Sequence, residues 1–195
     1  MAADRKNFIF FHCPLDGAQF IVANLIKIEN YYPDAASLGR LYDYIMSHAV
    51  EAGSYGCEVN YAVQQMLAVK HVFGKTQYRQ LRHYVFSVKA WELDIIHGYD
   101  GLLNIGWLVG TALKEYQILY GLHINTSFPH IHILINTTSY VTGGQLRNDN
   151  GMLFRIKYAV EKTYPKLNVD LRWSDPHSPV NRLDEAVEDD FLRID

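Results

Sequence analysis

The sequence predicts one α/β domain built on an antiparallel β-sheet. Residues 81–88 and 130–136 alternate in apolar and polar character, as strands do because successive side chains point to opposite faces. Residues 35–49 carry apolar side chains at three- and four-residue intervals, the spacing of an amphipathic helix. Four residues separate the strands expected at 117–125 and 130–136, which predicts an antiparallel hairpin.

The other elements can be placed in order along the chain. Asp34 is suited to cap the helix at 35–49, and Asn60 is suited to cap another at 60–72. Residues 50–58 contain Gly53 and Gly56 and are expected to form a flexible connection. The remaining expected elements are strands at 7–13 and 19–29, a long scaffold helix at 95–116 and a helix at 150–164. From residue 165 on, proline, aspartate and serine dominate, and we expect the acidic end to be a surface tail or the start of a linker.

Bulk composition fits an ordinary globular protein. The chain has 195 residues, of which 49% are hydrophobic and 20% charged, enough for one domain with a sizeable core. Cys13 and Cys57 offer neither a disulfide framework nor a metal-binding spacing. No apolar run approaches the ~18 residues of a membrane span. We therefore expect a cytoplasmic protein that does not insert into membranes.

Basic side chains are concentrated in one part of a chain that is slightly acidic overall. The net charge of −3 argues mildly against a nucleic-acid protein, but residues 180–195 alone hold six acidic and two basic side chains. Residues 59–91 contain no Asp or Glu, and their basic residues are Lys70, Lys75, Arg79, Arg82 and Lys89. With nearby aromatic rings they suit a groove for a nucleic-acid backbone, although a solvated face explains any one of them more simply.

The expected hairpin brings three of the nine histidines together. If Asn125 pairs with His130, then His123 lies opposite His132, and Ile124 joins the isoleucines on the buried face. Directly opposed side chains lie about 4.5 to 5.5 Å apart at Cβ, so three imidazoles come within reach of one ion. Such a site leaves positions open for water or substrate. The alternative is three structural histidines satisfied by hydrogen bonds.

The histidine spacing also resembles a known motif. His-x-Asn-x(4)-His-x-His-x(3)-Asn, formed by His123, Asn125, His130, His132 and Asn136, is similar to the histidine motif of the relaxases of conjugative plasmids and transposons, especially the MobP class. The resemblance covers about residues 19–164. It implies an α/β sandwich with helices packed on one face of an antiparallel sheet and the three-histidine site on the open face.

The helix at 35–49 contains the tyrosine implied as nucleophile. Residues 41–45 resemble the relaxase segment around the reactive tyrosine, and Tyr44 occupies its position. Tyr44 and His48 lie one turn apart on a flank of the apolar stripe, so both can project into a cleft. Tyr42 lies on the stripe and is the second candidate. A tyrosine that attacks a phosphodiester forms a covalent phosphotyrosine link.

The resemblance implies roles for several further residues. His123, His130 and His132 would hold a divalent ion, with Mg or Mn implied by the family, although imidazole also suits several transition metals. Asn136 would orient a ligand or the phosphate. Asn125 stands where the family commonly has an aspartate, and its amide cannot take up a proton.

The strand at 81–88 resembles the family's His-x(3)-Ser-Phe strand, with Val88 in place of the aromatic residue. His83 and Ser87 are therefore candidates to contact DNA, together with the basic residues named above. Ordinary polar strand residues are an equally good interpretation of both.

The function that the resemblance implies is that of a DNA relaxase, which nicks and rejoins single-stranded DNA at a transfer origin during conjugative mobilisation. Relaxosome accessory proteins and coupling proteins would be its partners. Two other classes remain open: an inactive relaxase-like DNA-binding accessory protein and a metal-dependent hydrolase of a small substrate. The expected organisation is an added N-terminal strand element at 1–18, a relaxase-like catalytic domain at 19–179 and an acidic tail at 180–195.

Overall fold

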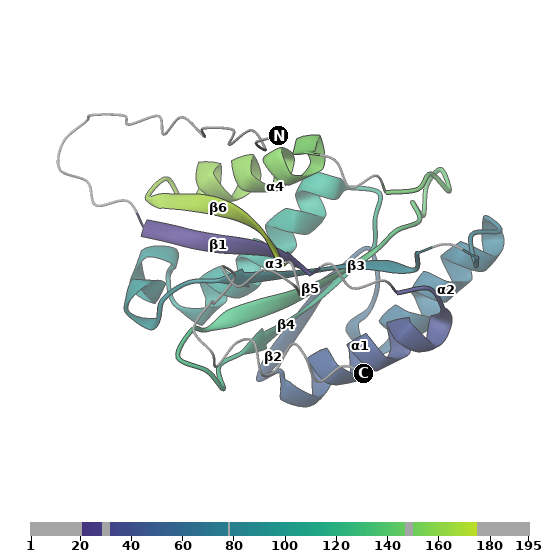
Figure 1. Cartoon of the computed structure of the whole chain (residues 1–195), viewed down its shortest axis with the longest axis horizontal. Helices are drawn as coiled ribbons and strands as arrows, with labels where there is room; N and C mark the ends of the chain where they lie inside the picture. The colour runs from purple at the N-terminus through teal and green to yellow at the C-terminus, as the bar shows by residue number, and fades with distance from the viewer. Residues whose placement is uncertain (1–20, 29–31, 78, 147–149, 175–195) are drawn as a thin grey trace, which may run out of the picture.

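A six-stranded β-sheet forms the centre of the protein (Figure 1). The computed structural model describes residues 21–28, 32–77, 79–146 and 150–174. The strands are β1 (Ile21–Ile28), β2 (Glu51–Tyr55), β3 (Leu81–Ser87), β4 (Ile118–His123), β5 (His130–Asn136) and β6 (Leu167–Ser174). The helices are α1 (Ala35–His48), α2 (Ala62–Val72), α3 (Tyr99–Leu113) and α4 (Asn150–Thr163), with short 3-10 helices η1 (Val59–Tyr61) and η2 (Ala90–Ile96).

Across the sheet the strands follow the order β2-β4-β5-β3-β1-β6. Every neighbouring pair is antiparallel except β1 and β6, which are parallel. The predicted α/β class with an antiparallel sheet is confirmed. The predicted cap of α1 is also confirmed, because the Asp34 carboxylate accepts a hydrogen bond from the Ser37 amide at 2.7 Å.

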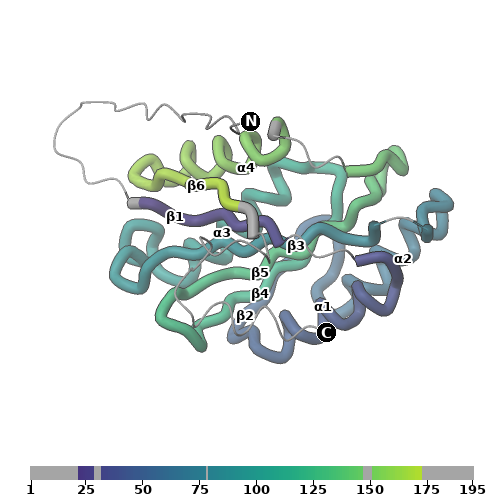
Figure 2. The backbone as a smooth tube through the Cα atoms, viewed as in Figure 1, coloured from purple at the N-terminus to yellow at the C-terminus, as the bar shows by residue number. Residues whose placement is uncertain are grey.

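Helices pack on both faces of the sheet. α3 and α4 cover one face, where an apolar cluster includes Tyr84, Phe86 and the three isoleucines of β5. α1 and α2 pack on Leu81, Leu119 and Leu134 of the opposite face. Figures 1 and 2 show these two helical layers on either side of the strands. α3 and α4 are therefore the helical layer we expected, and α1 and α2 cover part of the face expected to be open.

The hairpin of β4 and β5 has the expected faces but a different register. His123 pairs with His130, and Gly121 pairs with His132. The expected pairings of Asn125 with His130 and of His123 with His132 are wrong, because the connection spans residues 124–129 instead of four residues. A shift of two residues keeps each histidine on its face. Ile124, expected in the core, lies in the connection and is 41% exposed.

Two strands occupy segments that we expected to be irregular. The flexible connection expected at 50–58 is instead β2, which pairs with β4 at the sheet edge. In the region from residue 165, where proline, aspartate and serine residues led us to place no strand, β6 pairs with β1 and buries Leu167 and Val169. The elements expected at 7–13, 1–18 and 180–195 lie outside the described residues.

Two helices begin later than the sequence indicates. Asn60 lies within η1 instead of capping a helix, and α2 starts at Ala62. In the segment expected to be one helix at 95–116, η2 is followed by His97 and Gly98, whose φ angles of 67° and 78° separate it from α3. Among the described residues, no helix combines the length and apolar character needed to cross a membrane.

Candidate metal centre and tyrosine site

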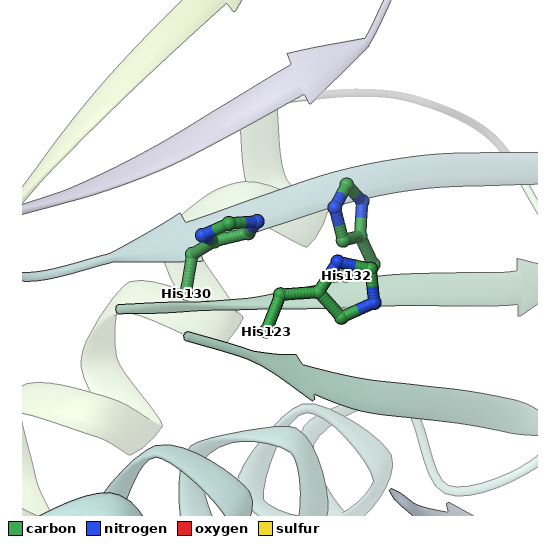
Figure 3. A group of neighbouring side chains, drawn as sticks. All are labelled: His123, His130 and His132. Atoms are coloured by element: carbon green, nitrogen blue, oxygen red, sulfur yellow. The ribbon is translucent and has the colours of Figure 1, made fainter. Parts of the chain in front are cut away.

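Three histidine side chains gather where β4 ends and β5 begins (Figure 3). His123 projects from β4, and His130 and His132 project from the same face of β5. One ring nitrogen from each residue lies within 4.8 Å of the other two, and all three side chains are buried. Three convergent imidazoles at this spacing form a donor set that fits one small metal ion.

Backbone carbonyls determine which nitrogen two of these rings offer. The Nε2 atom of His123 donates to the Ile45 carbonyl at 2.9 Å, and the Nδ1 atom of His130 donates to the Phe128 carbonyl at 2.9 Å. A carbonyl only accepts, so each bonded nitrogen carries the ring proton. The lone pair is therefore on Nδ1 of His123 and on Nε2 of His130, as metal ligation requires.

The third histidine is hydrogen-bonded to another imidazole. Nδ1 of His132 lies 2.8 Å from Nε2 of His83, and Nδ1 of His83 lies 3.1 Å from the Tyr32 hydroxyl. Burial, with repulsion from neighbouring histidines, lowers the pKa of His83 to about 3 and the pKa of His132 well below its usual value. Both rings are therefore neutral at physiological pH, the state in which imidazole binds metals.

Tyr44 lies beside the histidine cluster. Its ring centroid is 5.2 Å from that of His132 and 5.9 Å from that of His123. His48, one turn further along α1, places its ring 5.2 Å from Tyr44 and 5.8 Å from His123. Tyr44 is half-buried, and Tyr42 is half-buried in the apolar cluster beneath α1. α1 thus brings a phenol and a fourth imidazole to the three convergent rings.

Gly121 explains why α1 can approach the strands so closely. It pairs with His132 in the sheet, directly under the helix. A Cβ atom at Gly121 would lie 2.6 Å from Cγ2 of Ile45, closer than van der Waals contact allows. The absence of a side chain therefore lets α1 rest on β4, with the Ile45 carbonyl against His123. A glycine inside a strand is a sequence signal for such close approach, and our interpretation of the sequence overlooked it.

The two asparagines of the motif occupy different places in the fold. Asn125 is exposed in the connection after β4, not on the strand face where we expected it. Asn136 is fully buried, and its side-chain nitrogen donates to the Gln117 side chain at 2.9 Å and to the Met66 carbonyl at 3.4 Å. Its side-chain oxygen accepts from the Thr138 amide at 3.2 Å. These bonds tie the end of β5 to α2.

Three of the residues expected to contact DNA are buried or face away from the histidine cluster. Lys70 is fully buried and donates to Thr137 and Thr138, and burial lowers its pKa to about 8. Arg82 projects from the opposite face of β3 to His83, because neighbouring strand residues alternate. His83 is 1% exposed, and both its ring nitrogens are hydrogen-bonded to side chains. These positions give no support for contact with DNA at the histidine cluster, and DNA contact by these three residues stays a prediction.

The remaining basic residues lie at opposite ends of β3. Lys75 and Arg79 precede β3, near its pairing with Asn136, and both are half-buried. Lys89 follows β3 and is exposed, with its Nζ atom 5.3 Å from the Trp91 ring centroid. Ser87, the last residue of β3, pairs with His130. Lys89 is thus the basic residue at the histidine end of this strand.

A row of polar side chains crosses the sheet at the level of the histidine cluster. Asn24 pairs with Ser87, Ser87 with His130, and His130 with His123, so all four share one face. Within the described part of the chain, Oδ1 of Asn24 is buried and accepts no hydrogen bond. This row extends the polar surface of the site from β4 to β1.

Comparison with known proteins gives one family match. The chain matches the family described as "Relaxase: MobA/VirD2-like, nuclease domain" over residues 44–167, a stretch that includes Tyr44 and the three clustered histidines. Protein rlx of Staphylococcus aureus is 24% identical over 136 residues, which cover 69% of this chain and 40% of that protein. No solved structure gives a significant match. Since the family match spans more than half of its length, the chain belongs to the MobA/VirD2-like relaxase nuclease domain family.

Proposed function

We propose that this protein is a DNA-nicking transesterase that cleaves and rejoins single-stranded DNA at a transfer origin, with Tyr44 as the nucleophile. The observation that carries the proposal is the position of the Tyr44 ring, 5.2 Å from His132 and 5.9 Å from His123 between centroids. Membership of the relaxase nuclease family supports DNA as the substrate. The chain spans 40% of the length of its Staphylococcus aureus relative, so this function is proposed for the nuclease part.

A divalent ion would be held by Nδ1 of His123 and by Nε2 of His130 and His132. The converging nitrogens and the hydrogen bonds to the Ile45 and Phe128 carbonyls support this ligand set. Mg or Mn is proposed because phosphate oxygens can complete the coordination of either ion, and transition metals are competitors to be tested. When bound, the ion supplies positive charge beside the non-bridging oxygens of the scissile phosphate.

The proposed reaction exchanges one phosphodiester bond for another. The Tyr44 oxygen forms a bond to phosphorus, and the bond between phosphorus and the 3'-oxygen of the preceding nucleotide breaks. The phenolic proton passes to water, since Asn125 has no group to accept it, and the departing oxygen takes up a proton as a 3'-hydroxyl. The strand is left with a 5'-phosphotyrosyl link, and the reverse reaction rejoins it.

The scissile phosphate is proposed to lie at the histidine end of the sheet. Ser87 shares a face with His130, Asn24 continues the polar row, and Lys89 adds an exposed positive charge after β3. These residues support a DNA path that crosses β1 at Asn24 and the ends of β3 and β5 at Ser87 and His130. Lys75 and Arg79 precede Leu81, which lies six residues along β3 from Ser87, or roughly 20 Å at about 3.4 Å per residue, so they would contact nucleotides distant from the cleavage site.

A denaturing gel tests the proposed function directly. The protein is incubated with a fluorescent single-stranded oligonucleotide carrying the origin sequence, in the presence of Mg or Mn. We expect a covalent protein–DNA adduct that is absent in Tyr44→Phe and present in Tyr42→Phe, since both variants lose one hydroxyl from α1 but only Tyr44 contacts the histidines.

Other outcomes would favour the two alternative functions. Tight DNA binding without an adduct in the unmodified protein would indicate an inactive accessory protein that has kept the scaffold. No DNA affinity, together with metal-dependent hydrolysis of a small ester, would indicate a hydrolase. An adduct that persists in Tyr44→Phe would assign the nucleophile to another residue.

A further inference from the structure

We propose that Tyr32 and His83 are positioning residues that hold His132 in the tautomer needed for metal binding, through a buried chain of hydrogen bonds. The inference rests on the proposed metal site and adds a role that the family match does not assign. Tyr32, His83 and His132 come from three separate segments of the polypeptide: the irregular residues before α1, β3 and β5. These hydrogen bonds reach the proposed metal ligands at a single atom, Nδ1 of His132, the ring nitrogen that does not bind the ion.

The geometry leaves little freedom to these side chains. The Tyr32 oxygen lies 3.1 Å from Nδ1 of His83, and Nε2 of His83 lies 2.8 Å from Nδ1 of His132. All three residues are at most 5% exposed. A backbone hydrogen bond of 2.8 Å from Gln80 to the Tyr32 carbonyl ties this tyrosine to the residue before β3. The packing of the sheet therefore fixes Tyr32 and His83 in place, and His132 bonds to a buried side chain and not to water.

The position of one proton decides whether His132 can bind an ion. A neutral imidazole carries one N–H, so His83 donates either to His132 or to Tyr32. If His83 donates to His132, the proton of His132 is on Nε2 and blocks that nitrogen. If His132 donates to His83, then Nε2 of His132 has a free lone pair, and His83 donates onward to the Tyr32 oxygen. Metal binding at Nε2 therefore requires the second arrangement.

For His132, the His83 ring takes the part that backbone carbonyls play for His123 and His130: it accepts the hydrogen bond from the nitrogen that does not bind the ion. The proton positions of His123 and His130 are fixed because carbonyl oxygens cannot donate. His83 and Tyr32 can each donate or accept a hydrogen bond. Binding of an ion at Nε2 of His132 therefore also determines in which direction the two hydrogen bonds run. Because the partner of His132 is neutral and not a carboxylate, it leaves the charge of a bound ion undiminished for the phosphate.

The unmodified protein allows a direct test by ¹⁵N-histidine NMR. Ring nitrogens with and without a proton have distinct ¹⁵N shifts, so each tautomer can be identified without measuring activity. On saturation with Mg²⁺ we expect His132 and His83 both to carry their protons on Nδ1. A metal-saturated protein in which His83 carries its proton on Nε2 would overturn the inference while leaving the metal site intact. No response of any clustered histidine to Mg²⁺, Mn²⁺ or Zn²⁺ would overturn the metal site as well.

Variants then test whether the chain strengthens metal binding. His83→Leu removes the acceptor, and we expect Mn²⁺ affinity measured by calorimetry to fall about 10- to 100-fold. His83→Gln offers an amide oxygen to Nδ1 of His132 and should recover most of that loss. Tyr32→Phe should weaken binding several-fold, whereas Tyr42→Phe, in the same apolar cluster, should not. Equal affinities for folded His83→Leu and His83→Gln would contradict a role for the acceptor.

Discussion

Replacing Gly121 with alanine should separate Tyr44 from the histidines. α1 lies directly over Gly121, and a methyl group there would come within 2.6 Å of Ile45 Cγ2 and 3.2 Å of Ala49 Cβ. Carbon atoms in ordinary contact are about 3.5 to 4.0 Å apart, so α1 must move outward by roughly 1 Å. The same movement lengthens the 2.9 Å hydrogen bond from His123 to the Ile45 carbonyl.

This displacement is expected to reduce activity more than stability. One extra methyl group in a packed interface costs about 1 to 3 kcal/mol, whereas a ~1 Å displacement of a reacting group can lower the rate about 10²-fold. The measurements are the single-turnover rate of adduct formation and the free energy of unfolding in urea. Gly39→Ala is the matched control on α1, because among the described residues no atom outside the adjoining part of α1 lies within 4 Å of the added methyl group. We expect Gly39→Ala to form the adduct at the original rate and to raise the free energy of unfolding by about 0.5 to 1 kcal/mol.

A second substitution distinguishes displacement from other effects. Ile45→Leu removes the methyl group on the β-carbon that clashes, so combining it with Gly121→Ala should restore part of the rate. A folded Gly121→Ala protein that forms the adduct at the original rate would refute the idea that contact of α1 with β4 positions the nucleophile. Loss of activity in Gly39→Ala as well would show that any added methyl group on or under α1 lowers the rate, so the effect of Gly121→Ala would not be specific to the contact with β4.

Three further predictions concern Lys89, Lys70 and Asn136. Lys89→Ala should weaken binding of single-stranded DNA and reduce the slope of log affinity against log salt by about 0.7. Lys75→Ala should reduce the cleavage rate less than Lys89→Ala does. Lys70→Met should raise the free energy of unfolding at pH 7 by up to about 3 kcal/mol, because the pKa of the buried amine falls from 10.5 to about 8. The unfolded chain binds more protons between those pH values, so the stability of the unmodified protein should rise with pH from 8 to 10.5 and that of Lys70→Met should rise less. Asn136→Ala should cost about 1 to 3 kcal/mol of stability through the unpaired Gln117 and Met66 groups, with Mn²⁺ affinity unchanged in calorimetry.

Strand periodicity was sufficient to predict the faces of the hairpin, but not its register. His130 and His132 alternate with isoleucines, so one side of β5 had to be buried in the core, as observed. The register depends on the length of the connection, and Pro129 with Thr126 suggested a shorter turn than the one that forms. Thr126 instead accepts from the Phe128 amide and donates to its carbonyl within a longer loop.

The missed strands have compositions that usually indicate irregular structure. β2 contains Gly53, whose missing side chain makes room for the Tyr120 ring 2.5 Å from a hypothetical Cβ. That glycine serves a close contact between strands and not a turn. β6 does alternate, with Leu167, Val169 and Leu171 facing α4, but the neighbouring proline, aspartate and serine residues obscured the pattern.

Charge alone was a poor guide to which of the candidate side chains are exposed. A basic side chain predicts solvent exposure on average, but the burial of Lys70 depends on how α2 packs against the end of β5, which no local pattern encodes. The burial of His83 was equally hard to predict. Its spacing from Ser87 predicts the face of β3 on which it lies, whereas its hydrogen bonds to Tyr32 and His132 require three segments distant in sequence to meet.

Anomalous diffraction from crystals grown with Mn²⁺ tests the central claim most directly. We predict one strong peak within coordination distance of Nδ1 of His123 and Nε2 of both His130 and His132, with the Tyr44 ring beside it. A peak bound elsewhere, or no peak at the three rings under conditions in which the protein nicks DNA, would contradict a histidine-held ion next to the nucleophile.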